Sequence, residues 1–118
     1  MKMNENNAGL KAEQLAENYL KAQGLKLVTH NFHCRFGEID LIMLDANVLV
    51  FAEVRLRSNL KFGSAAASIT RTKQQKLTHT AEFYLQQYPH KYACRFDAVL
   101  MHKADKNDII WLKNIFDS

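Results

Sequence analysis

The sequence has few or none of the features typical of a multidomain, membrane-spanning or secreted protein. It has one proline in 118 residues and no low-complexity stretch, so no linker separates two domains. No apolar run approaches the roughly 20 residues that span a bilayer, and the N-terminal stretch MKMNENNAGLK lacks the apolar core of a secretory signal. We expect a cytoplasmic protein without a membrane partner, with a flexible tail at residues 1–8 and one domain at residues 9–118.

Cysteine is also scarce, and nothing in the sequence points to an oxidising compartment. The two cysteines, Cys34 and Cys94, are therefore expected to be free, buried thiols. Cys34 belongs to the segment HNFHC, in which His30 and His33 are two further soft ligands. Because no second ligand pair follows at zinc-site spacing, this segment favours a structural role over a zinc site.

Acidic residues are absent between Glu53 and Glu82, whereas cations are frequent there. The six cations are Arg55, Arg57, Lys61, Arg71, Lys73 and Lys76, which exceed the net charge of +4 for the whole chain. Such a concentrated basic segment is typical of a protein that binds a polyanion. We expect Lys73, Gln74 and Lys76 to contact phosphate, with Arg57, Lys61 and Arg71 nearby; a solvated basic face without a partner is the alternative.

The hydrophobic spacing predicts an α/β fold with a small mixed sheet flanked by helices, in the order α-β-β-β-α-β-(β). The predicted elements are a helix over 8–23, strands over 25–34, 37–44 and 48–57, a helix over 66–88, a strand over 93–102, and a last short strand or turn over 109–116. Gly24 and Pro89 follow the two helices and are expected to end them.

Two carboxylates interrupt strands that are otherwise apolar on both faces. Asp40 lies in EIDLIML and Glu53 lies in VFAEVRL, although central strands seldom carry an unpaired acid. If residues 46–47 form a two-residue hairpin loop, paired positions sum to 93 and Asp40 lies directly across from Glu53. A longer loop would shift this register, because Ala-Asn is not a strong loop pair.

Carboxylates on opposed strands repel unless a proton or a cation lies between them. A hard divalent ion such as Mg²⁺ or Mn²⁺ suits oxygen ligands from Asp40 and Glu53, and Arg55 shares the face of Glu53 by strand alternation. The alternatives are an edge position with both acids in water, or ion pairs with Arg55 and Arg35. Asp97 in CRFDAVL is expected to be structural and paired with Arg95 or Arg35.

Five motifs in order resemble the small YraN-like bacterial family: GEIDLI, LVFAEVRLRS, FGSAAAS, a lysine-rich helix and CRFDAVL. The resemblance runs from about Gly9 to Phe116. That family is similar to the Holliday junction resolvases of the restriction-endonuclease-like, or PD-(D/E)XK, superfamily, whose signature is an aspartate followed by Glu-x-Lys. The resemblance implies a restriction-endonuclease-like fold and metal-dependent cleavage of DNA.

Carried over residue by residue, the superfamily pattern places its metal-binding aspartate on Asp40, its glutamate on Glu53 and its first-helix glutamate on Glu13. Its lysine falls on Arg55, which stays protonated and cannot act as a general base, although it can orient water and bind phosphate. Spacing alone leaves Glu13 equally compatible with a solvated helix position. Arg55 in place of the superfamily lysine leaves metal binding intact, but it puts catalytic turnover in question.

Two main hypotheses follow. The first is an Mg²⁺- or Mn²⁺-dependent endonuclease that acts on DNA, including branched or flapped DNA, with RNA as a further substrate class. The second is a non-catalytic nucleic-acid-binding module on the same scaffold, and a protein-interaction adaptor is a third reading. Resolvases of this kind often act as dimers, so a homodimer is expected by analogy.

Overall fold

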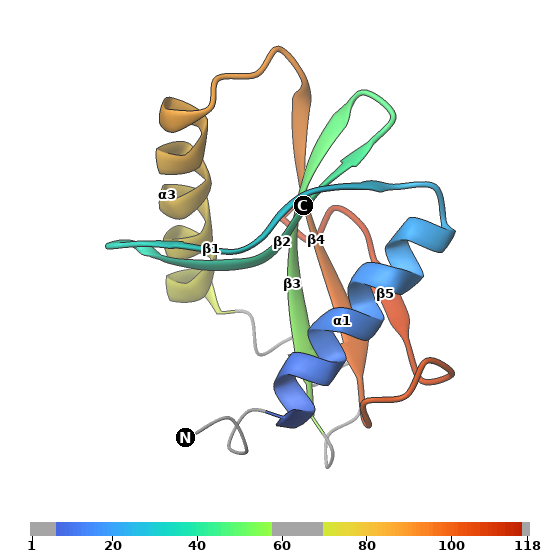
Figure 1. Ribbon diagram of the computed structural model, residues 1–118. Helices are drawn as coiled ribbons and strands as arrows, with labels where there is room; N and C mark the ends of the chain where they lie inside the picture. The colour runs from blue at the N-terminus through green and yellow to red at the C-terminus, as the bar shows by residue number, and fades with distance from the viewer. Residues whose placement is uncertain (1–6, 58–69, 117–118) are drawn as a thin grey trace.

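A mixed sheet runs through the centre of the molecule, with one described helix on each face (Figure 1). The computed structural model describes residues 7–57 and 70–116. The elements in these ranges are α1 (Asn7–Ala22), β1 (Lys26–Cys34), β2 (Gly37–Asp45), β3 (Val48–Leu56), α3 (Arg71–Gln87), β4 (Ala93–Met101) and β5 (Ile110–Leu112). This order confirms the predicted α/β fold and resolves the uncertain C-terminal segment as a strand.

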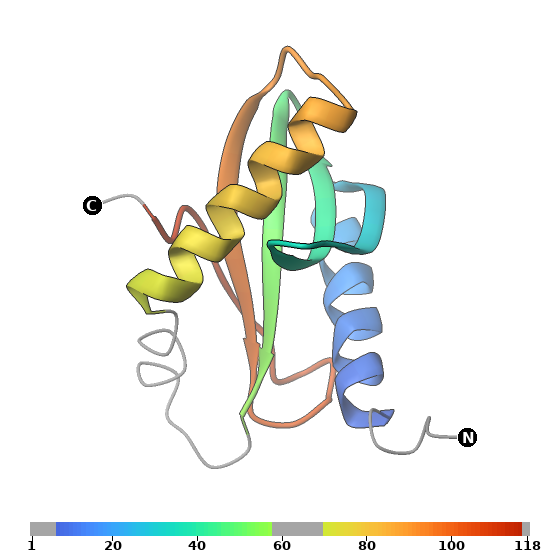
Figure 2. The same cartoon turned by 90° about the vertical axis from the view of Figure 1, so that its left-hand side faces the viewer.

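The five strands lie in the order β1-β2-β3-β4-β5. Strands β1, β2 and β3 are successively antiparallel, β3 and β4 are parallel, and β5 returns antiparallel to β4. A parallel pair needs a long crossover connection, and α3 lies in the connection between β3 and β4. Figure 2 shows α3 crossing the face of the sheet diagonally in front of β3 and β4.

Strand alternation divides the core into two clusters, one on each face of the sheet. Leu41 and Val50 belong to the cluster that includes Ala16 and Leu20 of α1. The residues that pack with α3 on the opposite face include Ile42, Phe51, Leu77 and Tyr84. Because β2 and β3 are apolar on both faces, they occupy interior positions, as the sequence predicts.

The two described helices end and begin where their capping residues require. Gly24, two residues after the end of α1 at Ala22, takes φ +100°, a conformation that suits glycine. Helix α3 begins at Arg71 rather than at the predicted residue 66, because Thr70 is extended and its side chain accepts a hydrogen bond from the Lys73 N–H. Tyr88, the last residue of the predicted helix, is its C-cap and is 55% exposed.

The hairpin between β2 and β3 has the predicted two-residue loop. Asp45 pairs with Val48, and the same register continues to Leu41 and Ala52. Ala46 takes φ 53° at the first loop position, where tight hairpin turns need a positive φ. The predicted register is therefore confirmed from the hairpin loop as far as the pair of Leu41 and Ala52, one position short of Asp40 and Glu53.

The structure differs from some of the features expected from the sequence and does not describe others. Both cysteines are free, but neither is buried as expected: Cys34 is half-buried and Cys94 is exposed. Neither described helix is long and apolar enough to cross a membrane. Most of the expected N-terminal tail, Lys61 and residues 66–69 of the expected second helix lie outside the described residues.

Candidate active site

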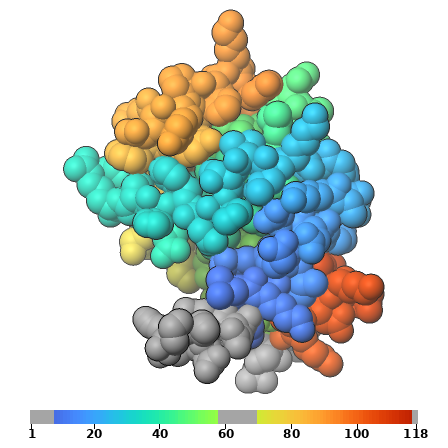
Figure 3. All heavy atoms as spheres, viewed as in Figure 1, coloured from blue at the N-terminus to red at the C-terminus, as the bar shows by residue number. Residues whose placement is uncertain are grey.

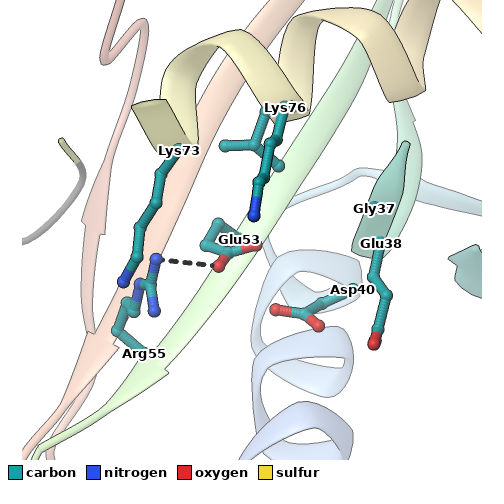
Figure 4. A pocket seen from close by; sticks show the side chains of 8 residues that line it. Gly37, Glu38, Asp40, Glu53, Arg55, Lys73 and Lys76 are labelled. Atoms are coloured by element: carbon teal, nitrogen blue, oxygen red, sulfur yellow. Dashed lines mark ion pairs between the residues drawn. The ribbon is translucent and has the colours of Figure 1, made fainter. Parts of the chain in front are cut away.

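Three acids and three cations line one pocket between β2, β3 and α3 (Figure 4). The pocket has a volume of about 340 Å³. Its lining residues are Gly37, Glu38, Asp40, Glu53, Arg55, Lys73, Lys76 and Leu77. The structure thus brings together Asp40, Glu53, Arg55, Lys73 and Lys76, which the sequence singles out for catalysis or phosphate contact.

Asp40 and Glu53 reach the pocket from adjacent strands. Phe51 lies on the α3 side of the sheet, so Glu53, two residues further along β3, faces α3 as well. Asp40 of β2 lines the same pocket as Glu53. Backbone pairing ends at Leu41 and Ala52. Beyond it, a carboxylate oxygen of Asp40 accepts a hydrogen bond from the Val54 N–H at 2.8 Å, which fixes the acid beside β3.

Arg55 is the partner of Glu53. Its Nη2 lies 3.1 Å from Glu53 Oε2, and the two side chains are only 10% and 17% exposed. The Nε of Arg55 is buried and has no hydrogen-bond partner among the described residues. A buried donor without a partner is costly, so Arg55 has an unused N–H with which it could bind an anion or water.

Burial governs the charge of both acids. Loss of solvent, and then the negative charge of Asp40, raises the pKa of Glu53 to about 7, although Arg55 and Lys73 lower it. Burial also raises the pKa of Asp40, against the hydrogen bond from Val54. Near neutral pH, Glu53 is therefore partly protonated beside the Asp40 carboxylate.

A glycine at the start of β2 lets α3 approach the strand. Gly37 has φ +151°, and a Cβ placed on it would lie 3.1 Å from Thr80 Oγ1 and 3.8 Å from the Cβ of Lys76. Thr80 is fully buried and donates its hydroxyl to the Lys76 carbonyl at 2.7 Å. Sequence reasoning did not assign Gly37 or Thr80 a role at the site; a glycine just before the acid-bearing strand is the signal that marks such a close approach.

The remaining basic residues differ in placement. Lys73 is half-buried and Lys76 exposed, and both project from the first turns of α3 into the pocket, Lys76 toward Glu53 and Lys73 beside Arg55 (Figure 4). Arg71 is exposed near the beginning of the same helix, and Gln74 is half-buried. Arg57 lies after β3, where its Nη1 donates to the Leu56 carbonyl at 2.9 Å. Their contacts with a nucleic acid stay predictions.

Glu13 lies apart from the pocket that holds Asp40 and Glu53. It lines a separate depression between α1 and β1, together with Leu10, Gln14, Glu17, His30, Asn31 and Leu41. Burial raises the pKa of Glu13, and the negative charges of Asp40 and Glu38 add to that shift. Its role as a third metal-side acid stays a prediction, because the structure does not bring it into the same pocket.

A complete set of metal ligands is not preassembled. Within residues 7–57 and 70–116, no three His, Cys, Asp or Glu side chains converge as a group that could hold a metal ion. This applies to His30, His33 and Cys34 as well as to Asp40 and Glu53. Asp40 and Glu53 therefore supply only part of a coordination sphere, and any ion there would need further oxygen ligands from water or substrate.

Asp97 has a structural role, as expected. Its side chain is fully buried and accepts two hydrogen bonds from Arg95, each at 2.9 Å. It also accepts from Trp111 Nε1 and from the Asn114 N–H, both at 2.9 Å. Arg95 is the predicted partner that the structure selects, and the network ties β4 to β5 and the segment after it.

The comparison with known families decides the relationship of this chain. Residues 12–101 match the model described as "Uncharacterised protein family UPF0102". The chain belongs to this family. A UPF0102 protein of Nitrosomonas europaea is 50% identical over 111 residues, which cover 94% of each chain. A UPF0102 protein of Legionella pneumophila is 51% identical over 109 residues, covering 91% of this chain and 92% of its relative.

Membership in UPF0102 agrees with the expectation of a small bacterial family. The matched range includes Glu13, Asp40, Glu53, Arg55 and the described part of the basic segment. Because the family description states no activity, the link to Holliday junction resolvases stays a prediction. The geometry of the pocket therefore carries the functional argument.

Proposed function

We propose that this UPF0102 protein is a metal-dependent nuclease that cleaves DNA phosphodiesters, with Asp40 and Glu53 holding Mg²⁺ or Mn²⁺. The observation that carries the proposal is the convergence of two partly buried carboxylates, Asp40 and Glu53, on a pocket that also contains Arg55, Lys73 and Lys76. Acids attract a divalent cation, whereas the surrounding bases attract phosphate. A pocket that contains both acids for a metal ion and bases for phosphate is typical of phosphoryl-transfer sites.

The donor set fits a hard divalent ion. Carboxylate oxygens from two strands are the ligands such an ion prefers, and Mg²⁺ commonly keeps several waters while one or two protein carboxylates hold it. The raised pKa of Glu53 indicates that the pair lacks positive charge. A bound ion would supply a water of lowered pKa and would offset charge on the phosphate.

The protein's own residues would position the substrate around this ion. Arg55 has a buried Nε without a partner among the described residues, and it can donate to a phosphate oxygen. Lys73 and Lys76 lie on α3 above the acids and can neutralise the flanking phosphates (Figure 4). Because Arg55 stays protonated, proton removal from the attacking water falls to a carboxylate or to solvent rather than to this position.

Cleavage assays test the proposal directly. Purified protein is incubated with labelled junction, flap, single-stranded and duplex DNA, and with RNA, in the presence of Mn²⁺ or EDTA. We expect cleavage only with the metal, and loss of at least about a hundredfold in Asp40→Asn and Glu53→Gln. Asp105→Asn, which changes an exposed carboxylate far along the chain, is the matched control. Cleavage that persists in Asp40→Asn, or no metal-dependent cleavage of any substrate, overturns the proposal.

The ion pair between Arg55 and Glu53 favours a second candidate, a nucleic-acid-binding module without chemistry. An arginine 3.1 Å from Glu53 already supplies positive charge where a metal would. This candidate predicts salt-sensitive DNA binding without cleavage. Metal titration separates the two functions: for the binding module, Mn²⁺ leaves the melting temperature of the free protein unchanged, whereas for the nuclease it raises that temperature unless Asp40 is replaced.

A further inference from the structure

A second pocket lies beside the tip of the β1–β2 hairpin, against the C-terminal half of α3. It has a volume of about 370 Å³, within the range of pockets that take small organic groups. Its lining residues are Arg35, Phe36, His79, Glu82, Phe83 and Gln86. None of them belongs to the metal-side pocket described above.

Aromatic rings form the apolar part of this second pocket. Phe36 has its ring centroid 6.0 Å from that of Phe83 and 5.9 Å from that of His79, and both pairs meet edge to face. The guanidinium carbon of Arg35 lies 4.9 Å from the centre of the Phe36 ring. Nucleobases stack on aromatic rings and on arginine guanidinium planes, and Phe36 and Arg35 supply one of each.

The position of these residues is unusual for a tight turn. Arg35 and Phe36 form the two-residue loop between the paired Cys34 and Gly37, where small residues that tolerate a positive φ are preferred. Figure 3 shows this hairpin tip projecting from one side of the molecule, next to the end of α3. Placing two large side chains at an exposed tip favours a role in contact with another molecule.

Polar groups complete the second pocket. Glu82 and Gln86 lie one helical turn apart on α3, and both are exposed. A carboxylate can accept hydrogen bonds from the amino group of a base, and an amide can both donate and accept along a base edge. Stacking faces together with such edge groups suit a nucleobase better than a purely apolar ligand.

The second pocket neighbours the metal-side pocket along both elements that build it. Phe36 precedes Gly37 directly, and Gly37 and Glu38 line the metal-side pocket. On α3, Lys76 of the metal-side pocket and His79 of the second pocket are three residues apart, about one helical turn. A strand whose phosphate lies at Lys76 would therefore bring a neighbouring base to Phe36.

We propose that the pocket of Arg35, Phe36, His79, Glu82, Phe83 and Gln86 binds one unpaired nucleobase of the DNA next to the cleaved phosphate. The inference rests on the proposed function and narrows its substrate class. A base inside a duplex cannot enter, because its faces are stacked and its edge is paired. Substrates with an unpaired base beside the cleavage position, such as flaps and bulges, are the class that fits.

Binding is measured in EDTA, so that no strand is cut. The probe is an oligonucleotide with one unpaired 2-aminopurine in a bulge, whose fluorescence falls when it stacks on an aromatic ring, and the same sequence fully paired serves as comparison. We expect quenching of the bulged probe only. In Phe36→Leu, affinity for the bulged DNA should fall by roughly fivefold or more, while affinity for the duplex stays the same.

Two further variants separate stacking from packing. Phe36→Trp keeps a ring at the hairpin tip and should retain both affinity and quenching, whereas Tyr88→Leu removes an exposed aromatic residue outside the pocket and should change neither. If Phe36→Leu weakens both probes equally, or if the bulged probe is not quenched, the inference is wrong. If binding then still depends on Lys73 and Lys76, the proposed function survives; if the protein binds no nucleic acid, both fail.

Discussion

A carboxylate oxygen of Asp40 lies 2.8 Å from the backbone nitrogen of Val54 and accepts its N–H. The bond replaces backbone pairing between β2 and β3, which ends one residue earlier at Leu41 and Ala52. Asp40 therefore satisfies a part-buried donor of the sheet while presenting negative charge to the pocket. Two substitutions can separate these roles.

We expect Asp40→Asn to keep the free energy of unfolding close to that of the unsubstituted protein, because an amide oxygen can accept the Val54 N–H. Asp40→Ala leaves this donor without its partner and should cost about 1–3 kcal/mol. Urea denaturation in EDTA measures both. Equal stability of the two variants would show that the hydrogen bond contributes little, and both should lose the stabilisation by Mn²⁺ that the proposed function predicts.

The raised pKa of Glu53 predicts that metal-free protein loses stability as pH rises. The folded state holds a proton up to about pH 7, whereas the unfolded state releases it near pH 4.5. The stabilisation is thus fully present below the unfolded pKa and is lost as pH rises through the folded pKa, at about 1.4 kcal/mol per pH unit in between. We expect a decrease on the order of 2–3 kcal/mol in the unfolding free energy.

Glu53→Gln is the control for this pH dependence. The difference between its unfolding free energy and that of the unsubstituted protein isolates Glu53 from the other titrating groups, and that difference should change with pH in the stated direction. A difference that stays constant across this range contradicts the raised pKa. Added Mn²⁺ should stabilise the unsubstituted protein most at the alkaline end, where the carboxylates are ionised.

Gly37 should tolerate no side chain. In Gly37→Ala, the φ of +151° strains the backbone and the new Cβ meets Thr80 Oγ1 at 3.1 Å, so we expect a loss of about 1 kcal/mol or more in unfolding free energy. Gly9→Ala is the matched control: Gly9 lies in α1 with nothing within 4 Å of its added Cβ. It should be neutral or stabilising by up to about 1 kcal/mol. Similar melting temperatures for the two variants would contradict the close approach of α3.

The buried carboxylate of Asp97 should stabilise the fold without contributing to the metal-side pocket. Asp97→Asn disrupts a network of four hydrogen bonds from Arg95, Trp111 and Asn114, with an expected cost of about 3–5 kcal/mol. The single tryptophan, Trp111, reports the change through its fluorescence. Asp45→Asn removes a second, 31% exposed partner of Arg95 and should cost under about 1 kcal/mol. Equal losses in the two variants would contradict the prediction.

The hydrophobic spacing predicted the order of elements, and the two-residue hairpin loop predicted the pairing of β2 with β3. Both succeed because they depend on local rules: strand alternation sets the face of each residue, and a two-residue loop sets the register. The same rules place Glu53 and Arg55 on one face. They did not show that pairing ends before Asp40, since that depends on how β2 diverges from β3 beneath α3.

The first residue of α3 and the location of Glu13 could not be predicted from local sequence patterns. Apolar spacing extended the helix back to residue 66, but the side-chain cap of Thr70 places its first residue at Arg71. Helical spacing allows Glu13 to face the sheet, but it does not predict which depression Glu13 lines. Its distance from the pocket is set by the packing of α1 on the opposite face.

The sequence by itself determined that two acids and a following arginine lie on adjacent buried strands, since burial and alternation follow from the order of apolar and polar residues. Only the tertiary structure decided what meets them. Helix α3, brought close by Gly37, adds Lys73 and Lys76 to the acids, and the same helix packs Phe83 against Phe36 at the hairpin tip. These contacts join residues far apart in the chain, and long-range packing rather than local pattern fixes them.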